Sequence, residues 1–275
     1  MDGHHYGELY DYWGGLADLE KKQVRVLHSL SFVDDPTRLL RAVRFEQRFQ
    51  FQIEKRTRQL MSEARELLKQ LSGERIRHEF DLIFNEPDPI VILRRLEELD
   101  LLEFIHPKLK WDTGMEKPLS TALNYYDYPE WNLPAMTGNT PTRLILAYLV
   151  WLISLPAPAG SEIGKRLRLS NQILEILEKS GSALNRPDFL KRLPPSQFTA
   201  ECDKVPILGI FALFCLTPDD ELKKKFELYA STWRRITPHL DGNSLREKGI
   251  PPGPLYSKIL AQLREAWLDG EINSE

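Results

Sequence analysis

Asp35 and the arginines that follow it are the residues of this sequence best suited to bind a polar ligand. Asp35 precedes Arg38, and further arginines recur every third or fourth residue. A carboxylate accepts a hydrogen bond from an exocyclic amine, and a guanidinium donates to ring nitrogens and carbonyl oxygens. The pattern therefore predicts a binding face for a ligand that offers both kinds of group. The later arginines are Arg41, Arg44 and Arg48.

A helix has to hold these side chains, and the residues around Asp35 predict where it begins. Aspartate caps free backbone N–H groups, and a proline such as Pro36 is tolerated at the first helical position. On a helical wheel the arginines fall on one side. Four guanidinium groups on one face repel each other, so we expect an anion or a network of carboxylates opposite them. The apolar side of the helix carries Leu39, Leu40 and Val43.

The segment resembles the nucleotide-reading helix of the class II tRNA nucleotidyltransferase and poly(A) polymerase family. That family carries the pattern acidic-Asp-x-x-Arg-x-x-Arg-x-x-Arg-Phe. The resemblance implies that Asp35 and Arg38 hydrogen-bond the base edge of incoming CTP or ATP, so that the protein itself acts as the template. It also implies that the next two arginines line the nucleotide pocket, support the reading pair and meet negative charge. The matching residues are Asp34, Asp35, Arg38, Arg41, Arg44 and Phe45.

The flanking segments extend the resemblance. Gly7–Leu19 and Val24–His28 look like the end of the family's catalytic head, with a paired-glycine turn, a short helix and a strand that carries an arginine. Arg48–Glu54 is similar to the neck motif Arg-Phe-Gly-Phe-x-Ile-Glu, except that Gln50 replaces the usual glycine. Glycine suits a left-handed helix end, and glutamine adopts that conformation at a cost.

The motifs of the family's metal-binding head do not occur in the printed sequence. They are a glycine-rich turn followed by an Asp-x-Asp pair, and a later Arg-Arg-Asp-Phe segment. In the family the two carboxylates hold Mg²⁺, which activates the tRNA 3′-hydroxyl and steadies the triphosphate. We therefore expect no catalytic or metal-binding residue in this chain and no nucleotide addition by the chain alone. Mg²⁺ would be bound by a separate catalytic head.

The apolar periodicity along the chain is mainly helical. The predicted fold is all-α, with a helical neck, body and tail and a short N-terminal remnant of an α/β nucleotidyltransferase head. By resemblance and composition, residues 1–33 are the head remnant, 34–110 the neck and RNA-binding region, 111–190 the body and 191–275 the tail.

Individual elements follow from the same pattern. The stretch 111–140 reads as irregular because it is rich in glycine and proline. Lys223–Lys225 reads as an exposed basic turn. Helices are predicted at 56–71, 74–84, 89–99, 143–155, 162–169, 171–182, 205–216 and 255–268.

RNA binding cannot rest on overall charge, since the formal net charge is −3, so it needs local basic faces. One such face extends from Arg38 to Arg58. Near the C-terminus, the loop before Pro254 resembles the family tail, where a helix N-terminus offers N–H groups to phosphate. A simple loop and cap is the alternative there. We predict contacts with tRNA from Arg48, Arg56, Arg75, Arg77, Lys223, Lys224 and Gly253.

Composition excludes other classes. Hydrophobic residues make up 42% and charged residues 28% of the chain, which is ordinary for a globular protein. No stretch reaches the roughly 18 apolar residues of a membrane span, so we expect a cytoplasmic protein without a membrane partner. Cys202 and Cys215 are expected to be free and partly buried, because a cytosolic chain rarely forms disulfides and two cysteines without a histidine pair make no zinc site.

Several alternatives stay open at the level of sequence. Asp35 could act only as an N-cap, with the arginines forming a solvated face beside Glu46 and Glu54. The expected partners are CTP, ATP and the tRNA 3′ end, with a separate catalytic head. The chain would then be a part of a CCA-adding, A-adding or poly(A)-adding enzyme, a split gene product, or a catalytically dead RNA-binding paralogue. A plain helical interaction module would explain the apolar core but not the spacing of Asp35 and the arginines.

Overall fold

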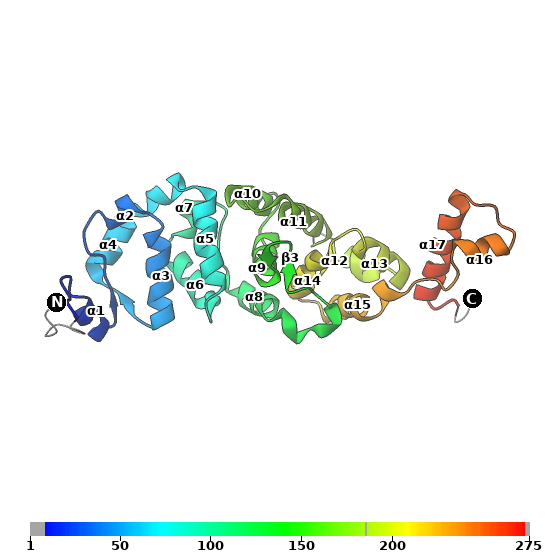
Figure 1. Cartoon of the computed structure of the whole chain (residues 1–275), viewed down its shortest axis with the longest axis horizontal. Coiled ribbons are helices and arrows are strands. Elements are labelled where there is room, and N and C mark those ends of the chain that lie inside the picture. The colour runs from blue at the N-terminus through cyan, green and yellow to red at the C-terminus, as the bar shows by residue number, and fades with distance from the viewer. Residues whose placement is uncertain (1–8, 185, 273–275) are drawn as a thin grey trace, which may run out of the picture. The chain divides into compact units, whose positions relative to one another are not determined.

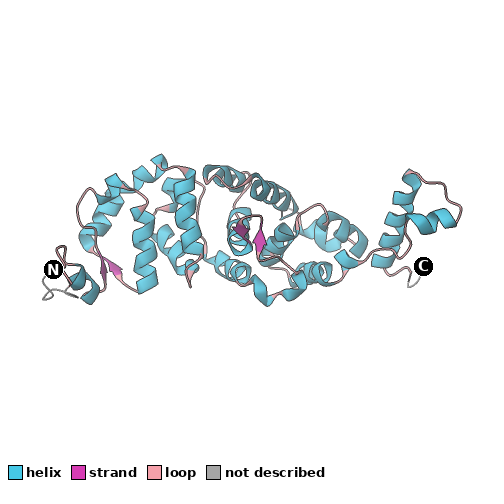
Figure 2. Ribbon diagram, viewed as in Figure 1, coloured by secondary structure: helices cyan, strands magenta, loops and turns pink. Residues whose placement is uncertain are grey.

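Helices make up most of the secondary structure of the computed structural model, which confirms the predicted mainly helical fold (Figure 1). The structure describes residues 9–184 and 186–272. Gly7 and Glu8, which open the predicted upstream motif, lie outside the described residues. The strands are short: β1 (Gln23–Val24) pairs in parallel with β2 (Gln52–Ile53), and β3 (Met136–Thr137) pairs antiparallel with β4 (Thr140–Pro141) (Figure 2).

The chain forms two units. Unit 1 comprises the residues up to Glu116 together with Glu162–Leu169, and unit 2 comprises Lys117–Ser161 and the residues from Ser170 onward. The domain boundaries inferred from the sequence, after residues 33, 110 and 190, stay predictions.

Unit 1 is built around a helix whose apolar side contacts two others. Helix α3 contacts α5 and α6, and its Leu39, Leu40 and Val43 are fully buried, as the helical wheel predicts. The α-helices are α1 (Gly15–Glu20), α2 (Ser31–Asp34), α3 (Arg38–Phe49), α4 (Lys55–Ala64), α5 (Gly73–Phe84), α6 (Pro89–Glu98) and α7 (Leu102–Ile105), with 3-10 helices η2 (Arg65–Gln70) and η3 (Thr113–Met115).

Both ends of α3 are set by local chemistry. The helix begins at Arg38 and not at Pro36, because the Asp35 side chain accepts the Thr37 N–H and the chain forms a turn before the helix. At the other end Gln50 has φ 54°, in the left-handed region. The helix thus keeps the left-handed end that the family's glycine suits, although a residue with a Cβ adopts it at a cost.

The upstream motif also folds as predicted. The Asp11 carboxylate accepts the N–H groups of Gly15 and Leu16, each at 2.8 Å, at the start of α1. Arg25 follows β1 and pairs with Asp18 of α1, with 2.8 Å between Nη2 and Oδ2. The ion pair between Asp18 and Arg25 thus links α1 to the residue that follows β1.

In the described part of unit 2, the regular secondary structure is helical apart from β3 and β4. Its core comes from two strongly apolar helices, α9 and α14, which contact each other and α11. The helices from Glu116 onward are α8 (Glu116–Leu123), η4 (Tyr125–Asp127), η5 (Pro129–Trp131), α9 (Thr142–Ile153), α10 (Ala159–Arg166), α11 (Asn171–Leu184), α12 (Pro187–Arg192), α13 (Pro195–Cys202), α14 (Ile207–Leu216), α15 (Asp220–Ser231), η6 (Trp233–Arg235), α16 (Gly242–Glu247) and α17 (Pro254–Leu268). Helix α10 continues into unit 1.

Three predictions about elements are wrong. The region 111–140 is not wholly irregular, because α8 forms there; Pro118 lies in its first turn, where proline is tolerated. Lys223–Lys225 is not a turn but lies inside α15, which Asp219 caps by accepting the Leu222 N–H at 2.9 Å. The helix predicted at 56–71 is α-helical only to Ala64 and continues as η2.

The two cysteines are free, as predicted, and both are buried more completely than expected. Burial raises the pKa of the Cys202 thiol and of the Cys215 thiol above the ordinary value. Both therefore stay protonated near neutral pH and behave as small apolar side chains.

Candidate functional site

The Asp35 carboxylate is half-buried, and one of its two oxygens makes three contacts. Oδ1 accepts from the Thr37 N–H at 3.0 Å and from the Thr37 hydroxyl at 2.6 Å, and it lies 2.7 Å from Nη2 of Arg75. Within the described residues no hydrogen bond reaches Oδ2. Burial acts to raise the pKa of Asp35, but the hydrogen bonds from Thr37 and the charges of Arg75 and Arg38 outweigh it, so the pKa lies below its ordinary value.

Arg38 lies beside Asp35 and is fixed along one edge. Its Nη1 donates to the backbone oxygen of Ser31 at 3.1 Å and to the Ser31 hydroxyl at 2.8 Å. The Nε and Nη2 groups make no hydrogen bond to the described part of the chain. Asp35 and Arg38 therefore present an acceptor oxygen and free N–H donors near each other, which is the combination that the sequence predicts.

Arg41 of α3 lines a pocket of about 370 Å³, together with Thr37 and residues of α5. Arg41 is a half-buried residue. The pocket holds both signs of charge, since Glu79 contributes a carboxylate and Arg75 a second guanidinium. The residues that line it are Thr37, Arg41, Glu74, Arg75, His78 and Glu79.

Arg44 is buried, and carboxylates surround it. Its Nη1 lies 3.0 Å from Oε1 of Glu86, and its Nη2 lies 3.8 Å from Oε2 of Glu79. Arg48 reaches the same Glu86 oxygen at 3.4 Å. Burial raises the pKa of Glu79, although the charges of Arg44 and Arg41 oppose the shift. The carboxylate network expected opposite the arginines is present, supplied by α5 and the residues that follow it.

The alternative of a solvated arginine face beside Glu46 and Glu54 is not what the structure has. Glu46 is buried, and Arg95 donates to it at 2.8 Å and 3.2 Å. Glu54 is the N-cap of α4 and accepts the N–H groups of Arg56 and Thr57. In the described part of the chain, no hydrogen bond or ion pair joins either acid to the arginines of α3, so Glu46 and Glu54 are not the partners of this face.

The hydrogen-bond and ion-pair partners of the site residues could not be predicted from the sequence. Ser31 and Thr37 lie close by in sequence but belong to no pattern that marks them as ligands of arginine or aspartate. Glu79 and Glu86 come from a different element, and only the packing of α5 against α3 brings them to Arg44. The link between Arg75 and Asp35 likewise depends on tertiary structure.

The predicted RNA-binding residues lie in both units and in different environments. In unit 1, Arg48 and Arg56 are exposed, and Arg77 contacts the backbone oxygen of Arg168. In unit 2, Lys224 is exposed, and Lys223 lies 4.9 Å above the ring of Phe214.

The loop glycine at the predicted tail site also has a defined environment. Gly253 is the N-cap residue of α17, its backbone is extended, and a Cβ there would meet open space. The fold therefore does not itself demand a glycine at this position.

In the described residues, no group of three or more His, Cys, Asp or Glu side chains is arranged to hold a metal ion. The same part of the chain has no helix that is long and apolar enough to cross a membrane.

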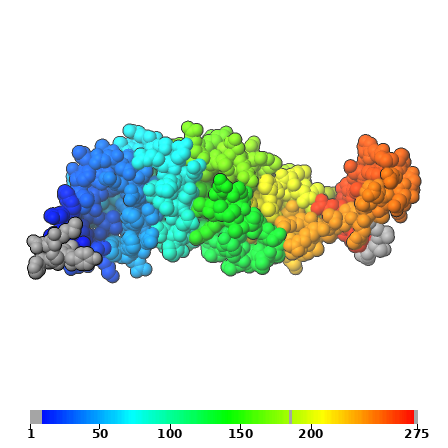
Figure 3. Space-filling view, viewed as in Figure 1, coloured from blue at the N-terminus to red at the C-terminus, as the bar shows by residue number. Residues whose placement is uncertain are grey.

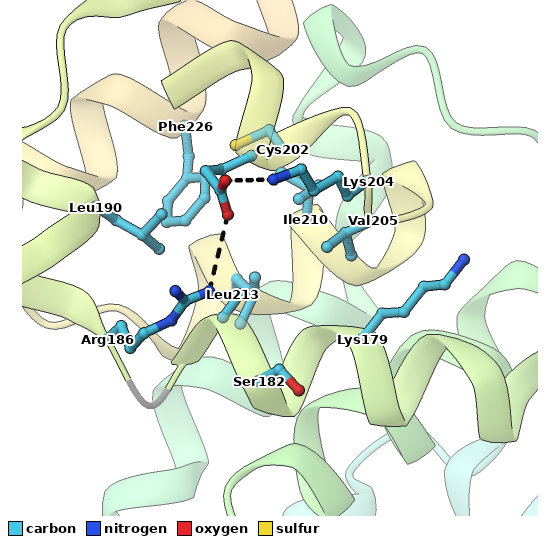
Figure 4. A pocket seen from close by; sticks show the side chains of 12 residues that line it. Lys179, Ser182, Arg186, Leu190, Cys202, Lys204, Val205, Ile210, Leu213 and Phe226 are labelled. Atoms are coloured by element: carbon cyan, nitrogen blue, oxygen red, sulfur yellow. Dashed lines mark hydrogen bonds and ion pairs between the residues drawn. The ribbon is translucent and has the colours of Figure 1, made fainter. Parts of the chain in front are cut away.

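A separate cavity of about 260 Å³ lies in unit 2 (Figure 4). Its walls are mostly apolar, including Leu190, Leu213 and Phe226. The cations at its rim are already paired, since Lys204 and Arg186 both approach the Glu201 carboxylate. None of the predicted site residues lines this cavity.

The chain is similar in sequence to a family model and to curated proteins. Residues 50–112 match the model of a family described as the probable RNA and SrmB-binding site of polymerase A. The chain is 32% identical to the A-adding tRNA nucleotidyltransferase of Geobacter sulfurreducens, covering 97% of this chain and 31% of that protein.

Solved structures give the same result. The Thermotoga maritima CCA-adding enzyme complexed with tRNA-CCA matches with a TM-score of 0.75 and 27% identity, over 96% of this chain and 64% of that one. A CCA-adding enzyme in complex with ATP matches with a TM-score of 0.77 and 28% identity, with the same coverage of both chains. The chain thus spans about a third of the Geobacter relative and less than two thirds of each of these enzymes. The predicted helix motif, the matched fold and these likenesses agree that the chain is similar to a part of the tRNA nucleotidyltransferases of class II.

Proposed function

We propose that this chain selects CTP or ATP with Asp35 and Arg38 and binds tRNA, for template-independent addition of all or part of the 3′-terminal CCA. The observation that carries the proposal is the pairing of a free carboxylate oxygen on Asp35 with the free N–H groups of the neighbouring Arg38. Both side chains are anchored on their other edges, so they offer a pre-formed recognition surface.

The chemistry of the four bases explains why this pair favours cytosine and adenine. Each of them carries an exocyclic amine that donates, next to a ring nitrogen that accepts. The amine suits the Asp35 carboxylate, and the ring nitrogen suits an N–H of Arg38. Uracil and guanine have a carbonyl oxygen in the place of the amine, and this oxygen would face the carboxylate without a proton between them. Selection would therefore need no nucleic-acid template.

The other arginines have supporting roles in this proposal. Arg41 lines the neighbouring pocket and has no hydrogen bond within the described chain, so it is available to the nucleotide. Arg44 stabilises the site indirectly, because its ion pair with Glu86 joins α3 to the residues that follow α5. The tRNA would contact Arg48, Arg56, Arg77, Lys223, Lys224 and the loop at Gly253.

Catalysis would require a head domain that binds Mg²⁺, because the family's Asp-x-Asp pair does not occur in the printed sequence. The exposed apolar side chains near the N-terminal end of unit 1 support the docking of such a domain. Of the fifteen large apolar side chains that are exposed in the described chain, ten lie between residues 9 and 49, the segment coloured blue in Figure 3. Apolar side chains become buried when a partner covers them, and this favours association. The ten are Leu9, Tyr10, Tyr12, Trp13, Leu16, Leu19, Leu27, Leu30, Val33 and Phe49.

Incorporation of labelled CTP and ATP into tRNA that lacks its 3′ end tests the proposal. The assay uses the purified chain with Mg²⁺, alone and with the head domain of an A-adding relative. We expect no incorporation by the chain alone and incorporation after the head is added. Incorporation by the chain alone would show that its own residues hold the catalytic metal. Failure of rescue, with RNA binding intact, would favour the alternative below.

A catalytically dead RNA-binding paralogue is the second candidate. The observation that favours it is the match of residues 50–112 to a family described by RNA binding. Such a protein would bind tRNA with the same affinity in the presence and absence of CTP, and it would not discriminate between nucleotides. A poly(A) polymerase relative would instead accept ATP but show no preference for tRNA over other RNA 3′ ends.

A further inference from the structure

We propose that Arg75 is a positioning residue that fixes the orientation of the Asp35 carboxylate and thereby sets the base specificity of the site. This inference rests on the proposed selection of CTP or ATP by Asp35 and Arg38. It gives Arg75 a role in nucleotide selection in place of the RNA contact that the sequence predicts.

The contacts of Asp35 show how its orientation is fixed. The terminal torsion of an aspartate side chain is soft, so a single hydrogen bond does not hold the plane of the carboxylate. Here Thr37 donates twice to Oδ1 from the same chain segment, and Arg75 approaches the same oxygen at 2.7 Å from a different helix. Donors from two elements fix both the position and the rotation of the carboxylate, and they leave Oδ2 as the acceptor for a ligand.

The N-terminus of α5, which carries Arg75, is itself held firmly within unit 1. Ser72 caps the helix and accepts the Arg75 N–H. Gly73 lies so close to the backbone of Arg166 that a Cβ there would overlap its carbonyl group. The Arg166 guanidinium donates to the backbone oxygen of Leu71 at 2.8 Å. Arg75 is therefore presented to Asp35 from a rigid base, as a positioning role requires.

The exposure of the pair separates positioning from stability. The Arg75 side chain is 51% exposed and that of Asp35 is 24% exposed. Ion pairs with this exposure contribute little to folding. Loss of Arg75 should leave the fold intact while allowing the plane of the carboxylate to turn away from the orientation in which one oxygen faces Thr37 and the other faces the ligand. The expected consequence is poorer discrimination between bases. Binding of the triphosphate, which all these nucleotides share, should not change.

The experiment measures the affinities of the full chain for CTP and UTP, which differ only in the base. Arg75→Ala should lower the CTP-over-UTP affinity ratio by about tenfold, the equivalent of one hydrogen bond to a charged group, chiefly through weaker CTP binding. Arg75→Lys should restore most of the ratio, because an ammonium still donates to Oδ1. The matched control is Arg94→Ala, which removes another arginine–carboxylate pair of unit 1, 2.6 Å from Glu116. It should leave the ratio unchanged.

The outcomes separate this inference from the proposed function. If Asp35→Ala abolishes the preference for CTP but Arg75→Ala does not, Arg75 has no positioning role, and the proposed function stands. If Arg75→Ala weakens CTP and UTP equally, its role is structural or electrostatic, and the inference fails. If it weakens tRNA binding while the ratio is unchanged, Arg75 is an RNA contact. If the wild-type chain does not distinguish CTP from UTP, the proposed function fails and the inference falls with it.

Discussion

Nη1 of Arg44 lies 3.0 Å from Oε1 of Glu86, and both side chains are more than nine-tenths buried. The pair joins the middle of α3 to the residues that follow α5. It therefore connects the helix that begins with Arg38 to the helix that carries Arg75. A buried pair of this kind is costly to break, because removal of one partner leaves the other charge without compensation.

Glu86→Gln should therefore destabilise unit 1 by about 3 kcal/mol. Its effect on stability is measured by urea unfolding of the full chain. Arg94→Ala, which breaks an exposed pair with Glu116, serves as the control and should change the unfolding free energy little. If the two variants unfold at the same urea concentration, the Arg44–Glu86 pair does not hold the helices together as we describe.

Near neutral pH, nucleotide selection should not depend on pH through any change in the charge of Asp35. Asp35 has a pKa below its ordinary value of 3.8, so the carboxylate is ionised at neutral pH and loses its charge only in strong acid. Its contribution to stability is present above that ordinary value and is lost as the pH falls through the lowered pKa. We expect a constant CTP-over-UTP ratio between about pH 5.5 and about pH 8. A ratio that changes within this range would contradict selection by an Asp35 carboxylate that stays ionised throughout it.

How far the sequence predicts this molecule depends on whether an interaction is local. The apolar side of α3 follows from a pattern within one segment, and the structure has it. The role of Asp35 and Arg38 in reading a base stays a proposal. The partners of Arg44 and of Asp35 could not be predicted, because Glu86 and Arg75 lie about forty residues away and meet them only through helix packing. The prediction of a turn at Lys223 is wrong, because the burial of Leu222 and Phe226 in the folded chain favours a helix there.

The basic residues of α4 should contribute to tRNA binding. Arg56→Ala removes an exposed cation without disturbing the Glu54 cap, which uses the backbone N–H of residue 56. We expect weaker tRNA binding and a salt dependence whose slope falls by about one unit. Filter binding over a range of salt concentrations measures both. Lys69→Ala is the matched control, because it also removes an exposed cation but has its own partner in Glu66. An equal effect of both variants would indicate only a non-specific loss of charge.

The exposed apolar side chains between residues 9 and 49 should contribute to binding of the catalytic head. Trp13 is 68% exposed, so Trp13→Ser should preserve the fold of the chain. We expect it to weaken binding of the head domain of an A-adding relative by about tenfold or more, since exposed aromatic residues are frequent hot spots. Isothermal titration calorimetry gives the affinity. Phe189→Ser, at an exposed apolar residue of unit 2 that is 44% exposed, is the control and should leave the affinity unchanged.

The most direct test of the account is the base selectivity of the purified chain. The affinities for CTP, ATP, UTP and GTP are measured for the wild type and for Asp35→Ala and Arg38→Ala. We predict that the wild type favours CTP and ATP by about tenfold or more, and that each substitution removes this preference while the triphosphate still binds. Equal affinities of the wild type for all four nucleotides, or an unchanged preference in both variants, would contradict the claim that Asp35 and Arg38 read the base.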